Sequence, residues 1–580
     1  MSTRTAPRIR FGPFEVDLHA GELLRLGARV NLQGQPFQVL ALLLERPGEM
    51  VTRDELCTKL WPADTFVDFE RGLNKAINKL RAALRDNADR PRFIETLPLR
   101  GYRFIARVES LPDTQPRSTP QVDSLAVLSL ENLSGDPSQE FFSDGLTEEL
   151  ICALANISSL RVISRTSAAT FKGSGKSLPQ IAKELGVAAV VEGTVARSGQ
   201  SVRVTVQLIL AANDSHIWAG RYERDLSDIL QLQAEIAQCI ARKIHKLIEP
   251  TESSHTQRMQ RVDPQAYETC LMGIFLRDKL TPLDLEQSVK CLNQAIQLDP
   301  QYARAYGELS LAYFYLGLFG MGPPADLFPK AKANAIRALE LDETIACAHI
   351  GLASVHVFYD WDWAAAEFEM KQALELRSGE SVTHAHYADF LSIRGHHSEA
   401  IKSFARVLEL DPISRVYIGH FGLILHRARR YVESIAQCRK ALAIDPYYVN
   451  ALWFMALSLE QIGELSGAIE SLERASSLAR GSHFIALLGR AYAVAGEKNK
   501  AFALLRELKE LSRQRYVSPF DIAIVHAGLG DRDAAFECLE NAYQQRVFRI
   551  IELTFPMFDD LRSDPRWVDM VRRVGLSRAF

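Results

Sequence analysis

The 580-residue sequence lacks the marks of several protein classes. Its eight cysteines stand singly with no C-x-x-C pair, which excludes a zinc knuckle or a disulfide framework and indicates reduced thiols. No run approaches the roughly 18 to 20 apolar residues of a membrane span, and the N-terminus has no apolar signal core. From these absences we expect a cytoplasmic protein that neither spans nor anchors in a membrane.

Catalytic and nucleotide-binding motifs are also missing or incomplete. The sequence contains no H-E-x-x-H motif and no Ser/His/Asp elbow. The string TFKGSGKS at 170–177 ends like a phosphate loop, but Thr170 stands where the first glycine of that loop belongs. We interpret it as a flexible basic loop, and we expect no enzymatic activity, no cofactor and no metal ion.

The charge of the chain is distributed unevenly. The formal net charge is −3, which by itself indicates little. Between residues 71 and 107, ten Lys and Arg stand against three acidic residues, so this stretch carries +7 and the remainder −10. The concentration of positive charge predicts a surface for an anionic partner.

The stretch from Phe69 to Arg107 combines a basic helix with a hairpin. Four apolar residues recur at the i, i+4, i+7, i+11 spacing of one helical face, namely Leu73, Ile77, Leu80 and Leu84. The other faces then carry basic and amide side chains, namely Asn74, Lys75, Asn78, Lys79, Arg81 and Arg85. After the helix, FIETL and GYRFIAR alternate apolar and polar residues around a Pro98–Gly101 turn, which predicts a β-hairpin with Arg100 at its tip.

The residues before this stretch complete a recognisable domain. Short strands are expected at 9–32, a helix from Pro36, and a second helix capped by the T-x-x-E pair Thr52 and Glu55. With the strings F-x-x-GLN-x-AI-x-x-LR and RFIETLP-x-RGYRF, residues 9–108 resemble the winged-helix domain of OmpR/PhoB-type regulators, in the CadC/ToxR-like one-component branch. The resemblance implies an α+β winged helix that binds double-stranded DNA.

The same resemblance implies roles for individual residues. The recognition helix would lie in the major groove, with Asn74, Lys75 and Asn78 at base edges. Phosphate contacts would come from Arg71, Lys79, Arg81 and Arg85, while Arg100 and Arg103 belong to the wing, whose tip reaches the flanking groove or backbone. The loop from Ala63 to Asp68 would contact RNA polymerase.

A second domain is expected after a linker at 109–123, which is rich in Pro, Ser and Thr. Residues 124–250 alternate strands and helices and end in a long helix, which predicts an α/β sandwich. The strings ENLSGDP, LRVISRTS, VVEGTV and RYERDLSDI resemble a TolB-N/FlgO-like domain.

A 34-residue repeat occupies positions 266–548. Small residues recur after the helix-opening turns at intervals of 33 to 35, namely Ala331, Ala366, Ala400, Ser434, Ala468, Ala501 and Ala535. This period is typical of tetratricopeptide repeats, and we count seven repeats plus a degenerate one at about 266–302. Residues 549–580 are expected to cap the open end of this all-α solenoid, whose groove would bind a protein partner or fold back on the other domains.

The sequence therefore predicts a multidomain one-component transcriptional regulator. DNA is its expected partner, and a second copy of the chain on DNA, RNA polymerase and a protein in the repeat groove are further candidates. Two alternatives stay open: an interaction scaffold whose winged helix contacts proteins, and a nucleotide-binding enzyme housed in residues 124–248.

Overall fold

The chain divides into two compact units, Met1–Ser118 and Thr119–Phe580. The computed structural model describes residues 8–17, 22–25, 28–30, 32, 35–60, 69–98, 100–111, 122–136, 139–155, 157, 160–199, 201–212, 214–248, 262–479 and 481–576. In those ranges no helix is long and apolar enough to cross a membrane.

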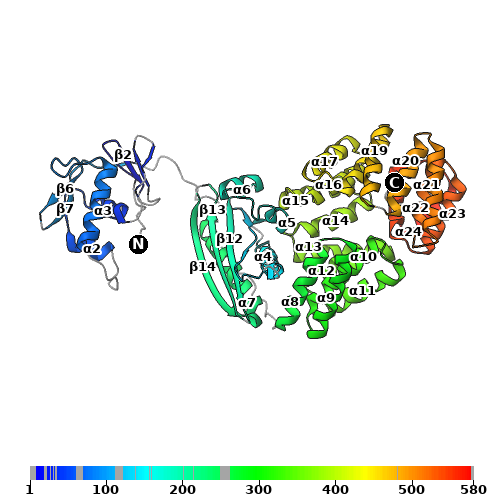
Figure 1. The fold of residues 1–580 in the computed structure, drawn as a ribbon, viewed down its shortest axis with the longest axis horizontal. Coiled ribbons are helices and arrows are strands. Elements are labelled where there is room, and N and C mark those ends of the chain that lie inside the picture. Colours follow the sequence, from blue (N-terminus) through cyan, green and yellow to red (C-terminus); the bar gives the residue numbers. More distant parts are fainter. Residues whose placement is uncertain are drawn as a thin grey trace. The chain divides into compact units, whose positions relative to one another are not determined.

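The first unit contains two antiparallel sheets and three helices in its described part (Figure 1). One sheet has the order β4-β3-β2-β1-β8 and consists of β1 (Arg8–Phe11), β2 (Phe14–Asp17), β3 (Glu22–Arg25), β4 (Ala28–Val30) and β8 (Glu109–Leu111). The other has the order β5-β7-β6 and consists of β5 (Met50–Thr52), β6 (Ile94–Leu97) and β7 (Gly101–Phe104). The helices are α1 (Gln35–Glu45), α2 (Arg53–Leu60) and α3 (Phe69–Leu84).

The helix cap predicted in this unit forms, whereas two of its strands were not predicted. The amide of Glu55 donates to Thr52 Oγ1 at 3.2 Å, and the amide of Thr52 donates to the Glu55 carboxylate at 3.4 Å, so the capping box is confirmed. Two strands were not predicted, β5 and β8. Strand β5 pairs with β7. Strand β8, which lies in the stretch predicted to be a linker, pairs with β1. Such pairing depends on residues far apart in sequence and leaves no periodic pattern.

One hydrophobic core ties the helices of this unit to both sheets. The apolar stripe of α3 is fully buried, with Leu73 and Leu80 at 0% exposure. Four phenylalanines connect the N-terminal sheet to the hairpin: the rings of Phe11 and Phe104 lie 4.9 Å apart and those of Phe14 and Phe93 lie 5.5 Å apart. Because each buried Phe contributes roughly 1.5–3 kcal/mol, this cluster holds the hairpin against the N-terminal sheet.

The second unit begins with a mixed sheet of order β11-β9-β12-β13-β14. Its strands β12, β13 and β14 are labelled in Figure 1. Strands β9 (Ser124–Val127), β11 (Arg161–Ile163) and β12 (Ala189–Ser198) are parallel, and β13 (Ser201–Leu210) and β14 (Ser215–Asp225) continue antiparallel, while the short β10 (Glu131–Asn132) pairs with β12. Helices α4 (Glu140–Ala155) and α7 (Ile229–Ile248) share one core with the sheet, and α6 (Leu178–Leu185) shares a smaller second core. The predicted order of strands and helices is confirmed, and the structure adds two short elements, β10 and α5 (Arg165–Ala169).

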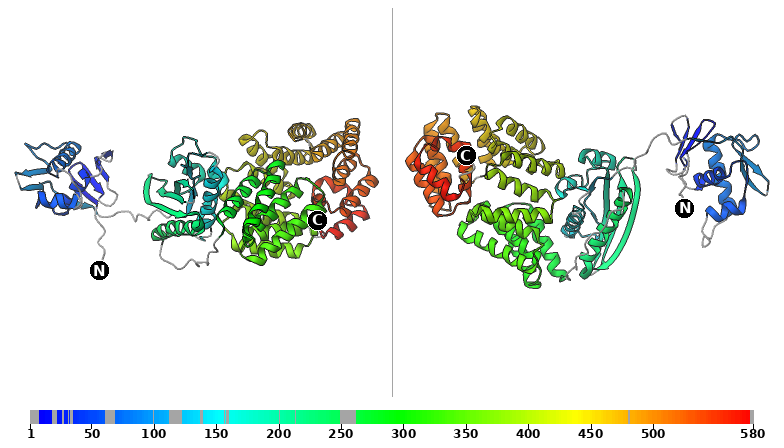
Figure 2. Two further views of the ribbon diagram at one scale, coloured as in Figure 1. Left: turned by 60° about the horizontal axis from the view of Figure 1, so that its bottom comes forward. Right: turned by 180° about the vertical axis from the view of Figure 1, so that it is seen from behind.

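The rest of this unit is a solenoid of paired antiparallel helices (Figure 2). In the described part of the chain the eight pairs are α8 (Pro264–Asp278) with α9 (Pro282–Leu298), α10 (Ala303–Leu318) with α11 (Pro324–Leu341), α12 (Ala346–Val355) with α13 (Trp363–Leu376), α14 (Ser381–Ile393) with α15 (His397–Leu410), α16 (Arg415–Arg427) with α17 (Tyr431–Ile444), α18 (Val449–Gln461) with α19 (Leu465–Leu478), α20 (Ser482–Val494) with α21 (Lys498–Leu511), and α22 (Pro519–Leu529) with α23 (Arg532–Gln544). The π-helical η3 (His356–Asp360) extends α12.

The repeated small residues explain why the helices of each pair pack closely. All seven of them, from Ala331 to Ala535, have 0% exposure. Glycines at the turn inside four repeats adopt left-handed backbone angles, with φ of 81° at Gly395 and 85° at Gly496, which a Cβ would oppose. The tetratricopeptide architecture predicted from the 34-residue period is therefore confirmed.

The C-terminal segment does more than cover the last repeat. It consists of η4 (Phe548–Thr554), η5 (Pro556–Leu561) and α24 (Pro565–Val574). Trp363 of α13 donates to the carbonyl of Val574 at 2.9 Å, and the guanidinium of Arg394, beside α14, donates to the carbonyl of Gly575 at 2.7 Å. The segment thus reaches back to repeats in the middle of the solenoid.

The sheet domain and the solenoid are joined by polar contacts of the stretch 161–167. The amide of Ser164 donates to the carbonyl of Leu410 at 2.8 Å, and the hydroxyl of Ser167 donates to the buried carboxylate of Asp411. In turn, the amide of Ile413 donates to the Ser167 hydroxyl at 3.1 Å. These contacts connect the end of β11 and the start of α5 with the end of α15.

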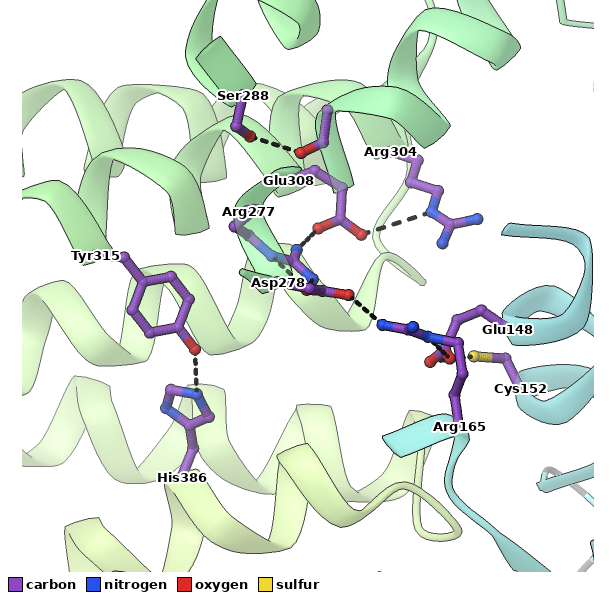
Figure 3. Close-up of polar contacts among 11 residues, drawn as sticks. Glu148, Cys152, Arg165, Arg277, Asp278, Ser288, Arg304, Glu308, Tyr315 and His386 are labelled. Atoms are coloured by element: carbon purple, nitrogen blue, oxygen red, sulfur yellow. Dashed lines mark hydrogen bonds and ion pairs between the residues drawn. The ribbon is translucent and has the colours of Figure 1, made fainter. Parts of the chain in front are cut away.

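Charged side chains continue this joint towards the first repeats (Figure 3). Arg165 is paired with Glu148 of α4 at 3.0 Å and with Asp278 of α8 at 2.8 Å. Burial raises the pKa of Glu148, and the guanidinium of Arg165 opposes that shift. The space left there is about 20 Å³, which is about the room that one water molecule needs. The joint is therefore a packed contact between the two parts of the unit.

Candidate nucleic-acid interface

The exposed face of α3 carries most of the predicted site. Asn74, Lys75, Asn78 and Lys79 are all exposed, because the apolar stripe that anchors the helix lies on the opposite side. This places two amides and two ammonium groups on neighbouring turns of one helix. The arrangement can offer hydrogen bonds to base edges and positive charge to phosphates.

Arg81 lies elsewhere than the sequence predicts. Its side chain is buried, at 8% exposure, and its guanidinium donates to the carbonyl of Ile94 at 2.9 Å and to Thr96 Oγ1 at 2.7 Å. Arg81 therefore connects α3 to the hairpin strand β6. This position does not suit a phosphate contact, because the charge is held inside the unit and directed away from solvent.

The hairpin presents its cations in two different ways. Arg100, in the turn between β6 and β7, is exposed. Arg103 is paired across the hairpin with Glu95 at 2.6 Å, and the two residues are direct neighbours in the register. The positive charge of the hairpin is consequently strongest at its tip.

The remaining predicted residues lie at the ends of α3. Arg85 follows the helix with a left-handed φ of 54° and is exposed. The side chain of Arg71 and the loop from Ala63 to Asp68 lie outside the described residues.

Two residues that the sequence did not single out complete the site. The guanidinium of Arg53, at the start of α2, donates to Asn74 Oδ1 at 2.8 Å and to the hydroxyl of Tyr102 at 2.9 Å. The Tyr102 hydroxyl also donates to Asn74 Oδ1 at 3.2 Å. Tyr102 belongs to the GYRF string of the hairpin, but nothing in the spacing of the sequence indicates that these three side chains meet.

The loop with the string TFKGSGKS at 170–177 lies in the second unit, and both of its lysines form ion pairs with carboxylates. Lys172 pairs with Glu140 and, at 3.0 Å, with Asp144. Lys176 pairs with Glu184 at 2.8 Å. In the described ranges no group of three or more His, Cys, Asp and Glu side chains is placed to hold a metal ion.

Comparison with known proteins agrees with this geometry. Residues 27–104 match the family described as "Transcriptional regulatory protein, C terminal", and residues 284–317 match "TPR repeat". The first match contains α3 and the hairpin, and the second contains parts of α9 and α10.

Three relatives extend the comparison along the chain. "Transcriptional regulator HilA" of Salmonella typhimurium is 24% identical over 458 residues, which cover 77% of this chain and 79% of that protein. "Putative adenylate cyclase 3" of Rhizobium meliloti is 31% identical over 240 residues, and the match spans only 41% of each chain. "Transcriptional activator CadC" of Escherichia coli is 27% identical over 147 residues, or 23% of this chain and 28% of that protein. The chain therefore combines an N-terminal OmpR/PhoB-type DNA-binding domain of transcriptional regulators with tetratricopeptide repeats.

Proposed function

We propose that the chain is a one-component transcriptional regulator whose first unit binds double-stranded DNA. The observation that carries the proposal is the face of α3, where Asn74, Lys75, Asn78 and Lys79 are exposed while the opposite face is locked into the core. Helix α3 enters the major groove, and the tip of the hairpin, with Arg100, reaches the flanking backbone or groove.

The individual roles follow from exposure and chemistry. Asn74, Lys75 and Asn78 contact base edges, and Lys79 and Arg85 contact phosphates. Arg71 keeps the phosphate role that the resemblance implies. Arg81 is left out of the contacts because its guanidinium holds the hairpin against α3.

A salt titration with matched variants tests this proposal. The full-length protein with Lys75, Asn78 and Lys79 changed to Ala is compared with a control in which Arg10 and Arg46, two cations outside α3 and the hairpin, are changed to Ala. Each lost phosphate contact lowers the slope of log affinity against log salt concentration by about 0.9. We expect the triple variant to lose operator binding and the control to keep it. Undiminished binding by the triple variant in moderate salt would refute the assignment.

The second unit, in this proposal, receives the signal or the protein partner. The joint around Arg165 and Ser167 supports this role, because its polar contacts couple the sheet domain to the solenoid, so a change in one part can reach the other. RNA polymerase and a second copy of the chain are further proposed partners on DNA, and the protein acts in the cytoplasm, where the DNA is.

The proposal assigns no catalytic step to the chain. Lys172 and Lys176 are paired with carboxylates, which supports a structural role for the loop that resembles a phosphate loop. A thermal-shift panel with nucleotides tests this point, since a ligand that binds only the folded state raises its stability. A nucleotide-dependent rise in melting temperature would favour the enzyme alternative.

A further inference from the structure

Three side chains from separate elements form a closed hydrogen-bonded triangle that includes Asn74 on the exposed face of α3. Arg53 comes from α2, Asn74 from α3 and Tyr102 from β7. Arg53 donates to both of the others, at 2.8 and 2.9 Å, and Tyr102 donates to Asn74 at 3.2 Å. The guanidinium also lies over the Tyr102 ring, 5.5 Å from its centroid. The triangle therefore fixes the orientation of the Asn74 amide.

The chemistry of arginine decides which end of that amide points inward. A guanidinium has only donors, so the Asn74 atom facing Arg53 must be the carbonyl oxygen. That oxygen accepts a second hydrogen bond, from Tyr102, and a carbonyl oxygen has two lone pairs. Its accepting capacity is thus used within the protein, and the amino group, with two donors, is left for an outside partner.

Asn78, one turn further along α3, provides a contrast. It is exposed, and within the described residues its side chain has no hydrogen-bond partner. Its amide keeps both a donor and an acceptor, which is the combination that pairs with the N6 and N7 edge of adenine. Two asparagines on one face therefore differ in what they can recognise.

We propose that Asn74 reads its base as a hydrogen-bond donor only and selects an acceptor edge, guanine or thymine, over adenine and cytosine. The inference rests on the proposed DNA-binding function. Guanine presents N7 and O6 and thymine presents O4 as acceptors in the major groove, whereas cytosine presents a donor. Adenine presents N7, but its neighbouring N6 donor would find the Asn74 oxygen already occupied. Arg53 and Tyr102 are the positioning residues.

Selection of bound sequences from a randomised DNA library, with the full-length protein, tests the proposal. We expect one position that requires guanine or thymine, and N74A should relax that preference by about tenfold or more. N74D keeps an acceptor for Arg53 but presents an oxygen to the base, so the preference should move to cytosine. R53M removes one hydrogen bond to the Asn74 carbonyl oxygen, so the protein should accept adenine at the same position. Y102F removes the other hydrogen bond and replaces R53M if that variant does not fold. N78A is the matched control and should weaken the base preference at a different position of the DNA site.

The outcomes separate this inference from the proposed function. If the wild-type protein enriches no sequence, the proposed function fails and the inference fails with it. If it enriches a sequence that N74A leaves unchanged, only the inference is overturned. An adenine or cytosine at the position that N74A relaxes would also overturn it.

Discussion

Replacing Arg81 by Met should destabilise the first unit without removing a DNA contact. The substitution keeps much of the aliphatic volume but removes the hydrogen bonds to the Ile94 carbonyl and Thr96 Oγ1. A hydrogen bond from a charged donor contributes about 1.5–3 kcal/mol, so we expect a loss of about 3 kcal/mol in the free energy of unfolding. For a domain of this size that loss lowers the melting temperature by roughly 10 to 20 °C.

The assay compares stability with the salt dependence of DNA binding. Residues 1–118 form a compact unit with its own core, so this fragment serves for melting by circular dichroism, and the full-length protein serves for binding. Lys79→Met is the control: its exposed side chain should change stability by less than about 0.5 kcal/mol but reduce the salt slope by about 0.9. If R81M melted with the wild type and reduced the salt slope as K79M does, the structural role of Arg81 would be refuted.

Three further predictions concern the hairpin, the solenoid and the joint. Gly101→Ala places a Cβ against the Val51 carbonyl oxygen, well inside van der Waals contact, and should destabilise the first unit by about 2 kcal/mol or more, measured by thermal melting; an unchanged melting temperature would contradict it. Burial lowers the pKa of His386 to about 4 and of His426 to about 3, so the unfolded chain binds more protons below pH 6.5 and each residue should cost about 2 kcal/mol of stability at pH 5. Changing both to Asn should reduce the fall in the free energy of unfolding between pH 7 and pH 5, measured by denaturant titrations. An unaltered pH dependence would show that the two histidines do not cause that fall. Arg165→Met leaves two carboxylates facing each other and should lower the unfolding free energy of the second unit by about 2–3 kcal/mol; denaturation midpoints equal to the wild type would show that the ion pairs contribute nothing.

Features that depend on a local pattern or on a regular repeat could be predicted from the sequence. The stripe of Leu73, Ile77, Leu80 and Leu84 marks the buried face of α3, because helical geometry converts that spacing into one side of a cylinder. The Thr52–Glu55 cap depends on residues three apart and forms as predicted. The 34-residue recurrence of small residues predicted the solenoid, because each repeat meets its neighbours in the same way.

Contacts between distant segments depended on the tertiary structure. Arg81 and Lys79 look alike in sequence, yet the fold of β6 against α3 buries one and leaves the other exposed. Ser167 meets Asp411 across 244 positions, and no local pattern records such a meeting.

The candidate DNA-binding site also has features that the sequence predicts and features that depend on the tertiary structure. The sequence by itself determined that α3 has an exposed basic and amide face, since a buried apolar stripe leaves the opposite side to solvent. Only the tertiary structure decided which ends of those amides remain available. Arg53 and Tyr102 reach Asn74 because α2 and β7 converge on α3, and a side chain's hydrogen-bonding partners are set by neighbours in space rather than along the chain.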